Sequence, residues 1–196
     1  MSCGVALKIA IDILHVPSQV RFYRSEPLPD DVLTLLHIVA GDTEVEREAA
    51  ALADRPPEVV RRAAGFFIEQ ILFAPDADSY QVLGASPQAS SAELRRNSGL
   101  LLRWLHPDLD PRGERSIFIG RVTAAWNDLK TPERRATYDQ ARRNAKDRRK
   151  SHQKMDRVRS WGHAVAPYRG SAAADSRSTY GFLRRALSVL FQTNWQ

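Results

Sequence analysis

Several features are scarce in this sequence of 196 residues. Its one cysteine, Cys3, excludes an internal disulfide framework and fits a reducing compartment. No apolar run reaches the length that spans a membrane. Residues 5–14 are apolar, but Lys8 and Asp12 interrupt them and no recognisable signal-peptide cleavage site follows. We therefore expect a cytoplasmic protein.

Motifs for catalysis and for cofactor binding are also missing. The 5 histidines stand singly, without the spacing of metal ligands. No glycine-rich phosphate loop and no nucleophile motif occurs. We expect no catalytic residue, no cofactor and no metal site, and we predict that the chain is not an enzyme.

Charge divides the chain into three parts. Residues 1–78 hold 7 basic and 13 acidic side chains, a net charge of −6, whereas residues 79–160 hold 18 and 9, a net charge of +9. Residues 161–196 carry +3. The change of sign predicts a boundary near residue 78, and the hydrophobic content of 43% is typical of a folded protein.

The acidic part, residues 1–77, has the pattern of a small helical domain. Apolar residues recur at helical spacing, and Thr43 with Glu46 resembles a capping box. We predict helices over residues 32–39, 43–53 and 56–73, which can share a small core. Residues 5–14 fit a helix or a strand, and residues 20–23 are short and β-prone.

A second capping box opens the first helix of the basic part. Ser90 and Glu93 stand three residues apart ahead of an apolar pattern. Pro107 lacks a backbone donor and disfavours helical geometry in the residue before it, so the helix should end near Leu105. The expected core stripe is Leu94, Asn97/Ser98, Leu101 and Leu105, and the basic residues expected on other faces are Arg95, Arg96 and Arg103.

Two further helices are predicted after this one. Apolar residues from Phe118 to Leu129 mark one face of a helix that can pack antiparallel on the first. Thr131 and Pro132 then fit an N-cap followed by proline at the first helical position.

Taken in order, these elements resemble a J-domain, the module of DnaJ-type co-chaperones, over residues 78–143. The resemblance covers roughly a third of the chain. It rests on the run from Tyr80 to Gly84, on His106-Pro107-Asp108, on Phe118, Ala125-Trp126 and Leu129, and on Thr131-Pro132-Glu133-Arg134-Arg135 leading to Tyr138-Asp139. It implies an all-α fold: a helical hairpin with short flanking helices.

The resemblance also implies a partner, a DnaK-type heat-shock chaperone of the seventy-kilodalton class. J-domains bind such a chaperone and accelerate its ATP hydrolysis, so that it closes on a client polypeptide. The implied contact residues are the loop His106, Pro107 and Asp108 and the basic helix face Arg95, Arg96 and Arg103. A carboxylate at Asp108 can accept two bonds from a partner arginine. In the alternative interpretation, the tripeptide is only a turn that ends the helix, and the three arginines only form a solvated charged face.

The helix before the tripeptide departs from the family pattern. Gly99 costs about 1 kcal/mol relative to alanine within a helix. Leu100, Leu102 and Trp104 cannot all fit one core stripe, so some are exposed or covered by another part of the chain. Leu109 stands where the family often has a lysine or arginine. We expect weaker stimulation of the chaperone, or stimulation tuned to one particular chaperone.

The flanking parts leave alternatives open. Residues 1–77 are expected to be a scaffold that packs against the J-domain, or a site that selects clients or a subcellular address. The basic block 142–150 extends the last helix or remains disordered. Residues 144–179 are expected to form a basic extension and linker. Residues 180–196 fit an amphipathic helix that docks on the body, binds a partner or lies on a membrane.

The rival function is a scaffold with a J-domain fold that binds nucleic acid or a membrane through its basic tail. The basic block has no interleaved aromatic residues, which disfavours specific nucleic-acid binding.

Overall fold

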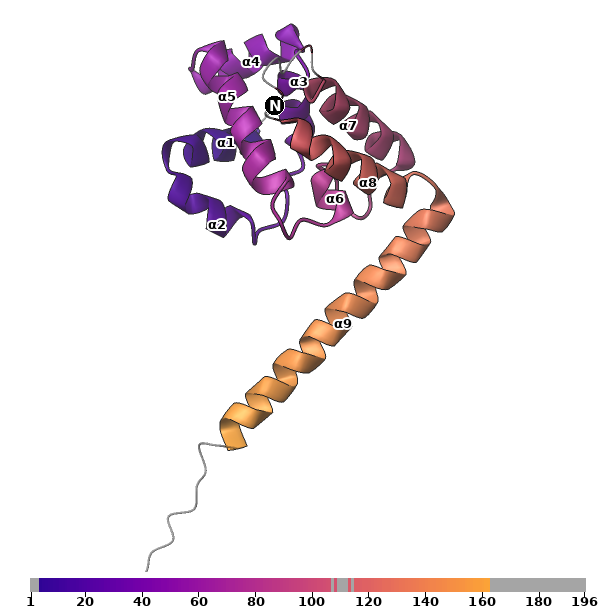
Figure 1. Ribbon diagram of the computed structural model, residues 1–196. Coiled ribbons are helices and arrows are strands. Elements are labelled where there is room, and N and C mark those ends of the chain that lie inside the picture. The colour runs from indigo at the N-terminus through magenta and orange to yellow at the C-terminus, as the bar shows by residue number, and fades with distance from the viewer. Residues whose placement is uncertain (1–3, 107, 109–112, 114, 163–196) are drawn as a thin grey trace, which may run out of the picture. The chain divides into compact units, whose positions relative to one another are not determined.

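The computed structural model describes residues 4–106, 108, 113 and 115–162, and every regular element in these residues is helical (Figure 1). The predicted all-α fold is confirmed. The chain forms two units, residues 1–150 and 151–196. Residues 163–196, including the predicted amphipathic helix at 180–196, lie outside the described part.

The elements follow one another with short connections. In chain order they are α1 (Val5–His15), the 3₁₀ turn η1 (Pro17–Gln19), α2 (Val20–Tyr23), α3 (Val32–Val39), α4 (Thr43–Ala53), α5 (Pro57–Phe67), the π-helical η2 (Ile68–Leu72), α6 (Ser79–Val82), α7 (Ser91–Trp104), the 3₁₀ turn η3 (Ser116–Phe118), α8 (Ile119–Leu129) and α9 (Pro132–Gly162). The helix α9 therefore continues through the basic block 142–150.

The acidic part holds the three predicted helices, with two corrections. Residues 20–23 are helical rather than β, because Val20 is buried and Arg24 Nε donates to the Gln70 carbonyl at 2.8 Å, so tertiary contacts override local preference. The cap of α4 is Asp42, whose carboxylate accepts from the Val45 N–H at 3.3 Å, one residue before the predicted start of the box. Residues 5–14, left open above, are helical.

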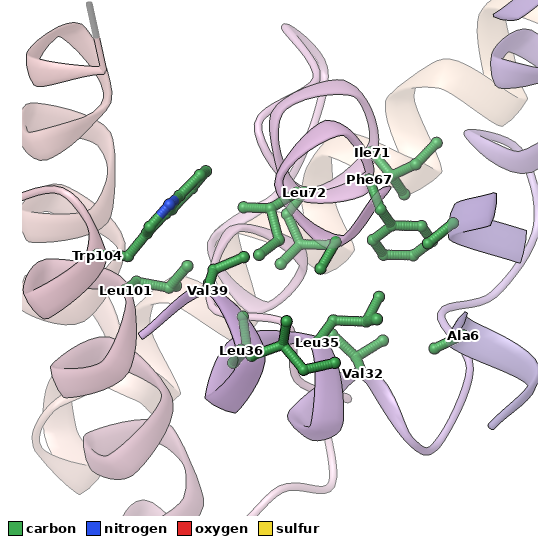
Figure 2. Close-up of a cluster of buried hydrophobic side chains, with 14 of the residues drawn as sticks. Ala6, Val32, Leu35, Leu36, Val39, Phe67, Ile71, Leu72, Leu101 and Trp104 are labelled. Atoms are coloured by element: carbon green, nitrogen blue, oxygen red, sulfur yellow. The ribbon is translucent and has the colours of Figure 1, made fainter. Parts of the chain in front are cut away.

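One apolar core crosses the charge boundary at residue 78. Helix α3 packs against α1, α4 and α5 on one side and against α7 on the other. Leu36 of α3 and Leu101 of α7 are both completely buried in the same cluster (Figure 2). Because that cluster also includes Phe67 and Leu72, the N-terminal helices and the J-like helices share a single interior.

At Gly84 the two parts approach each other closely. Its φ is +59°, a conformation that strains any residue with a Cβ. A Cβ there would lie 3.0 Å from Val32 Cγ1 and 3.2 Å from Leu72 Cδ2. The glycine that ends the run from Tyr80 therefore allows both the turn and the contact with α3.

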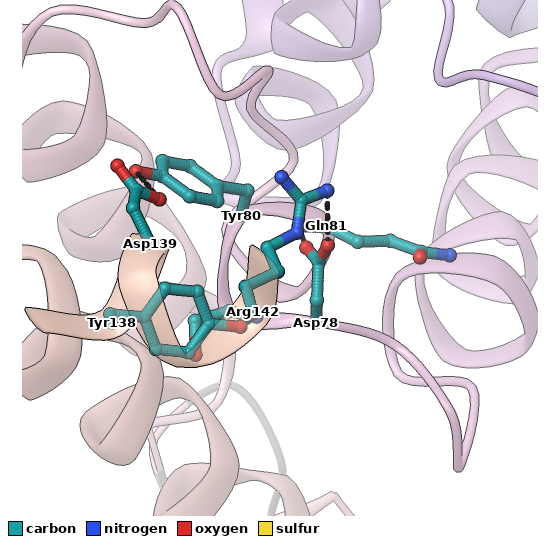
Figure 3. Close-up of polar contacts among 7 residues, drawn as sticks. Asp78, Tyr80, Gln81, Tyr138, Asp139 and Arg142 are labelled. Carbon is teal, nitrogen blue, oxygen red and sulfur yellow. Dashed lines mark hydrogen bonds and ion pairs between the residues drawn. The ribbon is translucent and has the colours of Figure 1, made fainter. Parts of the chain in front are cut away.

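Polar contacts fasten α6 to the start of α9 (Figure 3). The Tyr80 hydroxyl donates to Asp139 Oδ1 at 3.0 Å and accepts from Arg135 Nε at 2.9 Å. Burial raises the pKa of the Tyr80 phenol above its ordinary value, with Arg135 opposing the shift, so the hydroxyl keeps its proton at neutral pH. The family-like residues at both ends of residues 80–139 therefore bond directly to each other.

Two neighbouring contacts extend the same junction. The Ser79 N–H donates to the Tyr138 hydroxyl at 2.7 Å, and Arg142 pairs with Asp78 at 2.6 Å. Arg142 belongs to the basic block, yet its side chain is largely covered. The first residue of that block therefore helps to anchor α9.

In the described residues, no helix is both long and apolar enough to cross a bilayer.

We predict that Gly84→Ala lowers the free energy of unfolding by about 1–3 kcal/mol, because the new Cβ adds backbone strain and overlaps α3 and η2. Urea unfolding followed by circular dichroism measures this change. Gly99→Ala is the matched control: a Cβ at Gly99 meets no atom within 4 Å, so it should stabilise the protein by about 0.5–1 kcal/mol. Equal changes in the free energy of unfolding for the two substitutions would contradict the close packing of Gly84 against Val32 and Leu72.

Tyr80→Phe should destabilise the protein by about 1–2 kcal/mol, because it removes a hydroxyl that bonds both Asp139 and Arg135. The same unfolding experiment reads this loss. Tyr23→Phe serves as the control, since no hydrogen bond of the Tyr23 hydroxyl is found among the described residues. Equal free energies of unfolding for the two variants would show that the Tyr80 hydroxyl does not stabilise the contact between α6 and α9.

Candidate functional site

The helix α7 begins with the predicted capping box. The Ser90 hydroxyl accepts from the Glu93 N–H at 3.2 Å, and Glu93 Oε2 accepts from the Ser90 N–H at 2.7 Å. The pKa of the Glu93 carboxyl lies below its usual value, mainly because the Ser90 N–H bonds its charged form. Helix α7 therefore has a defined start 15 residues before Leu105, its C-cap.

The two faces of α7 separate as predicted. The buried residues are Leu94, Asn97, Ser98, Leu101, Trp104 and the C-cap Leu105. Arg95, Arg96 and Arg103 are all exposed. Arg96 and Arg103 are seven residues apart and so lie on one side of the helix, whereas Arg95 is turned about 100° away. The three arginines thus form two neighbouring rows rather than one cluster.

Gly99 lies on the exposed side between the arginines. A Cβ at this position would meet no atom within 4 Å, and Gly99 is exposed to solvent. The exposed face of α7 is therefore flat at its middle, with basic side chains before and after it.

His106 and Asp108 follow the end of α7 and are strongly exposed. Their side chains are 60% and 87% exposed, and His106 Nδ1 lies 3.4 Å from Asp108 Oδ2. Pro107 and residues 109–112, which include Leu109, lie outside the described residues. The exposure leaves the Asp108 carboxylate open to a guanidinium from another protein.

Two contacts compete for the same nitrogen of His106. The Asp108 N–H lies 3.3 Å from Nδ1 and can donate to it only while Nδ1 carries no proton. The ion pair with the Asp108 carboxylate requires the opposite, a protonated Nδ1. The two contacts therefore differ in whether Nδ1 carries a hydrogen.

Trp104, two residues before His106, is anchored by the N-terminal part. Only 5% of it is exposed. Its ring stacks against Phe73 at 6.4 Å, lies under the Arg115 guanidinium at 5.1 Å, and would meet a Cβ on Gly65 at 3.6 Å. The last turn of α7 is therefore held between the N-terminal helices and the residues that follow the loop.

The surplus of apolar residues in α7 is thereby accounted for. Trp104 is covered, Leu100 is half-buried against the core, and Leu102 stays 37% exposed. The expectation that another part of the chain covers some of them is confirmed, and that part is the acidic one.

Arg121 is a supporting residue that the sequence patterns missed. Its guanidinium donates to the carbonyls of Phe73 and Ala74, each at 2.6 Å. These carbonyls lie just after the π-helical η2. Arg121 of α8 therefore supplies hydrogen-bond donors to carbonyls at the end of that helix. Nothing local in the sequence indicated this contact, because Arg121 is 48 residues from Phe73 and 47 residues from Ala74 along the chain.

Metal chemistry has no visible site here. In the described ranges, no three or more His, Cys, Asp or Glu side chains gather in a way that could hold an ion.

Comparison with known proteins identifies the part of the chain that carries this helix and loop. The model of the DnaJ domain family matches residues 78–139. Chaperone protein DnaJ 1 of Mycobacterium leprae is 38% identical over 68 residues, which are 35% of this chain and 18% of that protein. DnaJ homolog subfamily C member 16 of Homo sapiens is 43% identical over 75 residues, 37% of this chain and 9% of that protein.

These relatives are much longer than the region they share with this chain, which spans less than a fifth of their length. No solved structure matches the chain. Helices α6 to α8, the exposed residues His106 and Asp108, and the junction of Tyr80 with Asp139 all fall within the matched range. Residues 78–139 of this chain are a DnaJ domain, and the predicted family resemblance is confirmed.

Proposed function

We propose that this chain is a co-chaperone that binds a DnaK-type heat-shock chaperone through its DnaJ domain and stimulates ATP hydrolysis by that chaperone. The observation that carries the proposal is the exposure of His106 and Asp108 at the end of α7, directly after a face bearing Arg96 and Arg103. We call these four residues, with Arg95 and Pro107, the docking surface.

The chemistry takes place in the partner, and this chain contributes only contacts. The Asp108 carboxylate is the acceptor for a partner arginine, a charge-assisted bond that is stronger than a neutral one. The arginines act over longer distances: they raise the rate of encounter with an acidic surface more than the final affinity. No group of this chain needs to bind ATP.

The N-terminal helices support this role by limiting motion at the end of α7. Trp104 is held by Phe73 and Arg115, so the helix end that presents His106 is ordered before the partner arrives. A pre-ordered surface loses less conformational entropy on binding. The flat middle of the face at Gly99 leaves fewer basic contacts, which fits weaker stimulation or stimulation tuned to one particular chaperone.

We predict that His106→Gln abolishes the stimulation. In single-turnover ATP hydrolysis by a DnaK-type chaperone, the wild type should raise the rate and the variant should lose about ten-fold or more, equivalent to about 1.4 kcal/mol. His15→Gln, in the exposed last turn of α1, is the matched control and should behave as the wild type. If the wild-type protein itself leaves the rate unchanged, the proposed function fails.

The double substitution Arg96→Ala and Arg103→Ala should slow association with the chaperone by about three- to ten-fold at low salt, with the difference shrinking as salt screens the charges. Stopped-flow binding at several salt concentrations measures this. Arg62→Ala, an exposed arginine of α5, provides the control. A loss that is independent of salt, or one shared by Arg62→Ala, would argue against electrostatic steering by α7.

A further inference from the structure

An apolar groove lies on the N-terminal helices, between α1, α2 and the segment that leads to α3. Its volume is about 300 Å³. Phe67 and Ile71 form a buried floor, and Ile9 and Leu28 are half-buried walls. We call it the N-terminal groove. It has room for one or two large apolar side chains, since a cavity of about 150 Å³ already holds a benzene ring.

The rim of the groove exposes aromatic and aliphatic surface. Phe22 is 61% exposed and Val5 is 58% exposed, and both line the groove. Scattered apolar residues on a surface need no explanation, but here they border one continuous apolar depression. Covering this rim would release ordered water and contribute hydrophobic free energy to binding.

The walls of the groove are tied in place. Arg24, next to α2, donates to the Gln70 carbonyl at 2.8 Å, and Asp31 accepts from the Ala6 N–H at 3.1 Å at the start of α1. Pro27 and Pro29 restrict the backbone of the segment between α2 and α3. The groove is therefore formed before a ligand arrives, which lowers the entropic cost of filling it.

Carboxylates stand at the same edge. Glu26 lines the groove, and Asp30 follows its wall residue Pro29 and faces an adjoining depression that shares residues 26–29 and is lined on another part by Arg96 and Arg142. Within the part of the chain that the structure describes, neither carboxylate has an ion-pair partner. They belong to a region with a net charge of −6. The electrostatic complement of this edge is a basic side chain.

We propose that the N-terminal groove binds client polypeptides, through an extended segment with one or two large apolar side chains next to lysine or arginine. The inference goes beyond recruitment of a chaperone, and it rests on the proposed function only in calling the polypeptide a client. The groove itself shares no residue with the docking surface, whereas Arg96 of that surface lines the adjoining depression that Asp30 faces. The apolar side chain enters over Phe67 and Ile71, and the basic one meets Glu26 and Asp30.

Other occupants fit the charge less well. An anionic membrane surface would be repelled by the free carboxylates at the edge. A second copy of the chain, docked symmetrically, would bring the same acidic edges toward each other. Both remain distinct outcomes of the experiment.

The test is direct peptide binding by the full chain, followed by fluorescence anisotropy. The probe is a labelled peptide with a central Leu-Phe-Leu flanked by lysines, compared with the same peptide carrying glutamates in place of the lysines. The wild type should bind the lysine peptide at least about ten-fold more tightly, a difference of about 1.4 kcal/mol.

Phe22→Ala should weaken binding of the lysine peptide by about five-fold or more, because it removes the exposed rim. Leu52→Ala is the matched control, since Leu52 is 59% exposed on α4 and does not line the groove. The double substitution Glu26→Gln and Asp30→Asn should remove most of the preference for lysine over glutamate. Each variant is first checked for an unchanged unfolding midpoint.

Three results would overturn the proposal: equal affinity for the two peptides, unchanged binding by Phe22→Ala, or loss of the groove's exposure through self-association in sedimentation. Binding to vesicles of phosphatidylcholine and phosphatidylserine that Phe22→Ala abolishes, without peptide binding, would assign the groove to lipid instead. The peptide-binding experiment contains no chaperone. A negative result in it therefore does not contradict the proposed ATPase stimulation, and a negative ATPase result does not contradict peptide binding.

Discussion

Packing of α3 between two groups of helices is the contact on which the rest of residues 4–150 depends. Leu36 and its neighbours face α5 on one side and α7 on the other, and all of them belong to one buried cluster. The approach is so close that a Cβ at position 84 would press on Val32 of α3, 3.0 Å away. An acidic segment and a basic segment are therefore joined by apolar contact, because burial of side chains is indifferent to the net charge of the surface around them.

This packing also determines the free surface of the DnaJ domain. One side of α7 is buried in the core, and the Trp104 ring contacts Phe73 and Arg115. The opposite side keeps its arginines in solvent and leads directly to His106 and Asp108. The N-terminal helices thus brace the docking surface from behind and leave its exposed side uncovered.

The same N-terminal helices carry an apolar groove whose rim is exposed to solvent. Its floor is part of the core, while Phe22 and Val5 remain at the surface with free carboxylates beside them. The groove and the exposed side of α7 are thus two separate surfaces of residues 4–106, and both are formed around the same apolar core.

Much of the fold was predictable because its signals are local. Ser90 and Glu93 mark a helix start through bonds that span three residues, and the apolar spacing of α7 and α8 identifies their buried faces. The tripeptide at 106–108 and the run from Tyr80 to Gly84 indicated the family. The predicted exposure of Arg95, Arg96 and Arg103 follows from the same periodicity.

The sequence by itself thus determined the helices of the DnaJ domain, the end of α7 and the identity of the candidate docking residues, because capping, proline sterics and helical periodicity act over a few neighbouring residues. Only the tertiary structure decided that residues 20–23 are helical, that Trp104 is covered by the acidic part, and that a groove forms beside Phe22. Those outcomes depend on contacts such as Arg24 with Gln70 and Phe73 with Trp104, which join residues 46 and 31 positions apart. Contacts at that separation depend on how the surfaces of whole helices fit together, which no local pattern specifies.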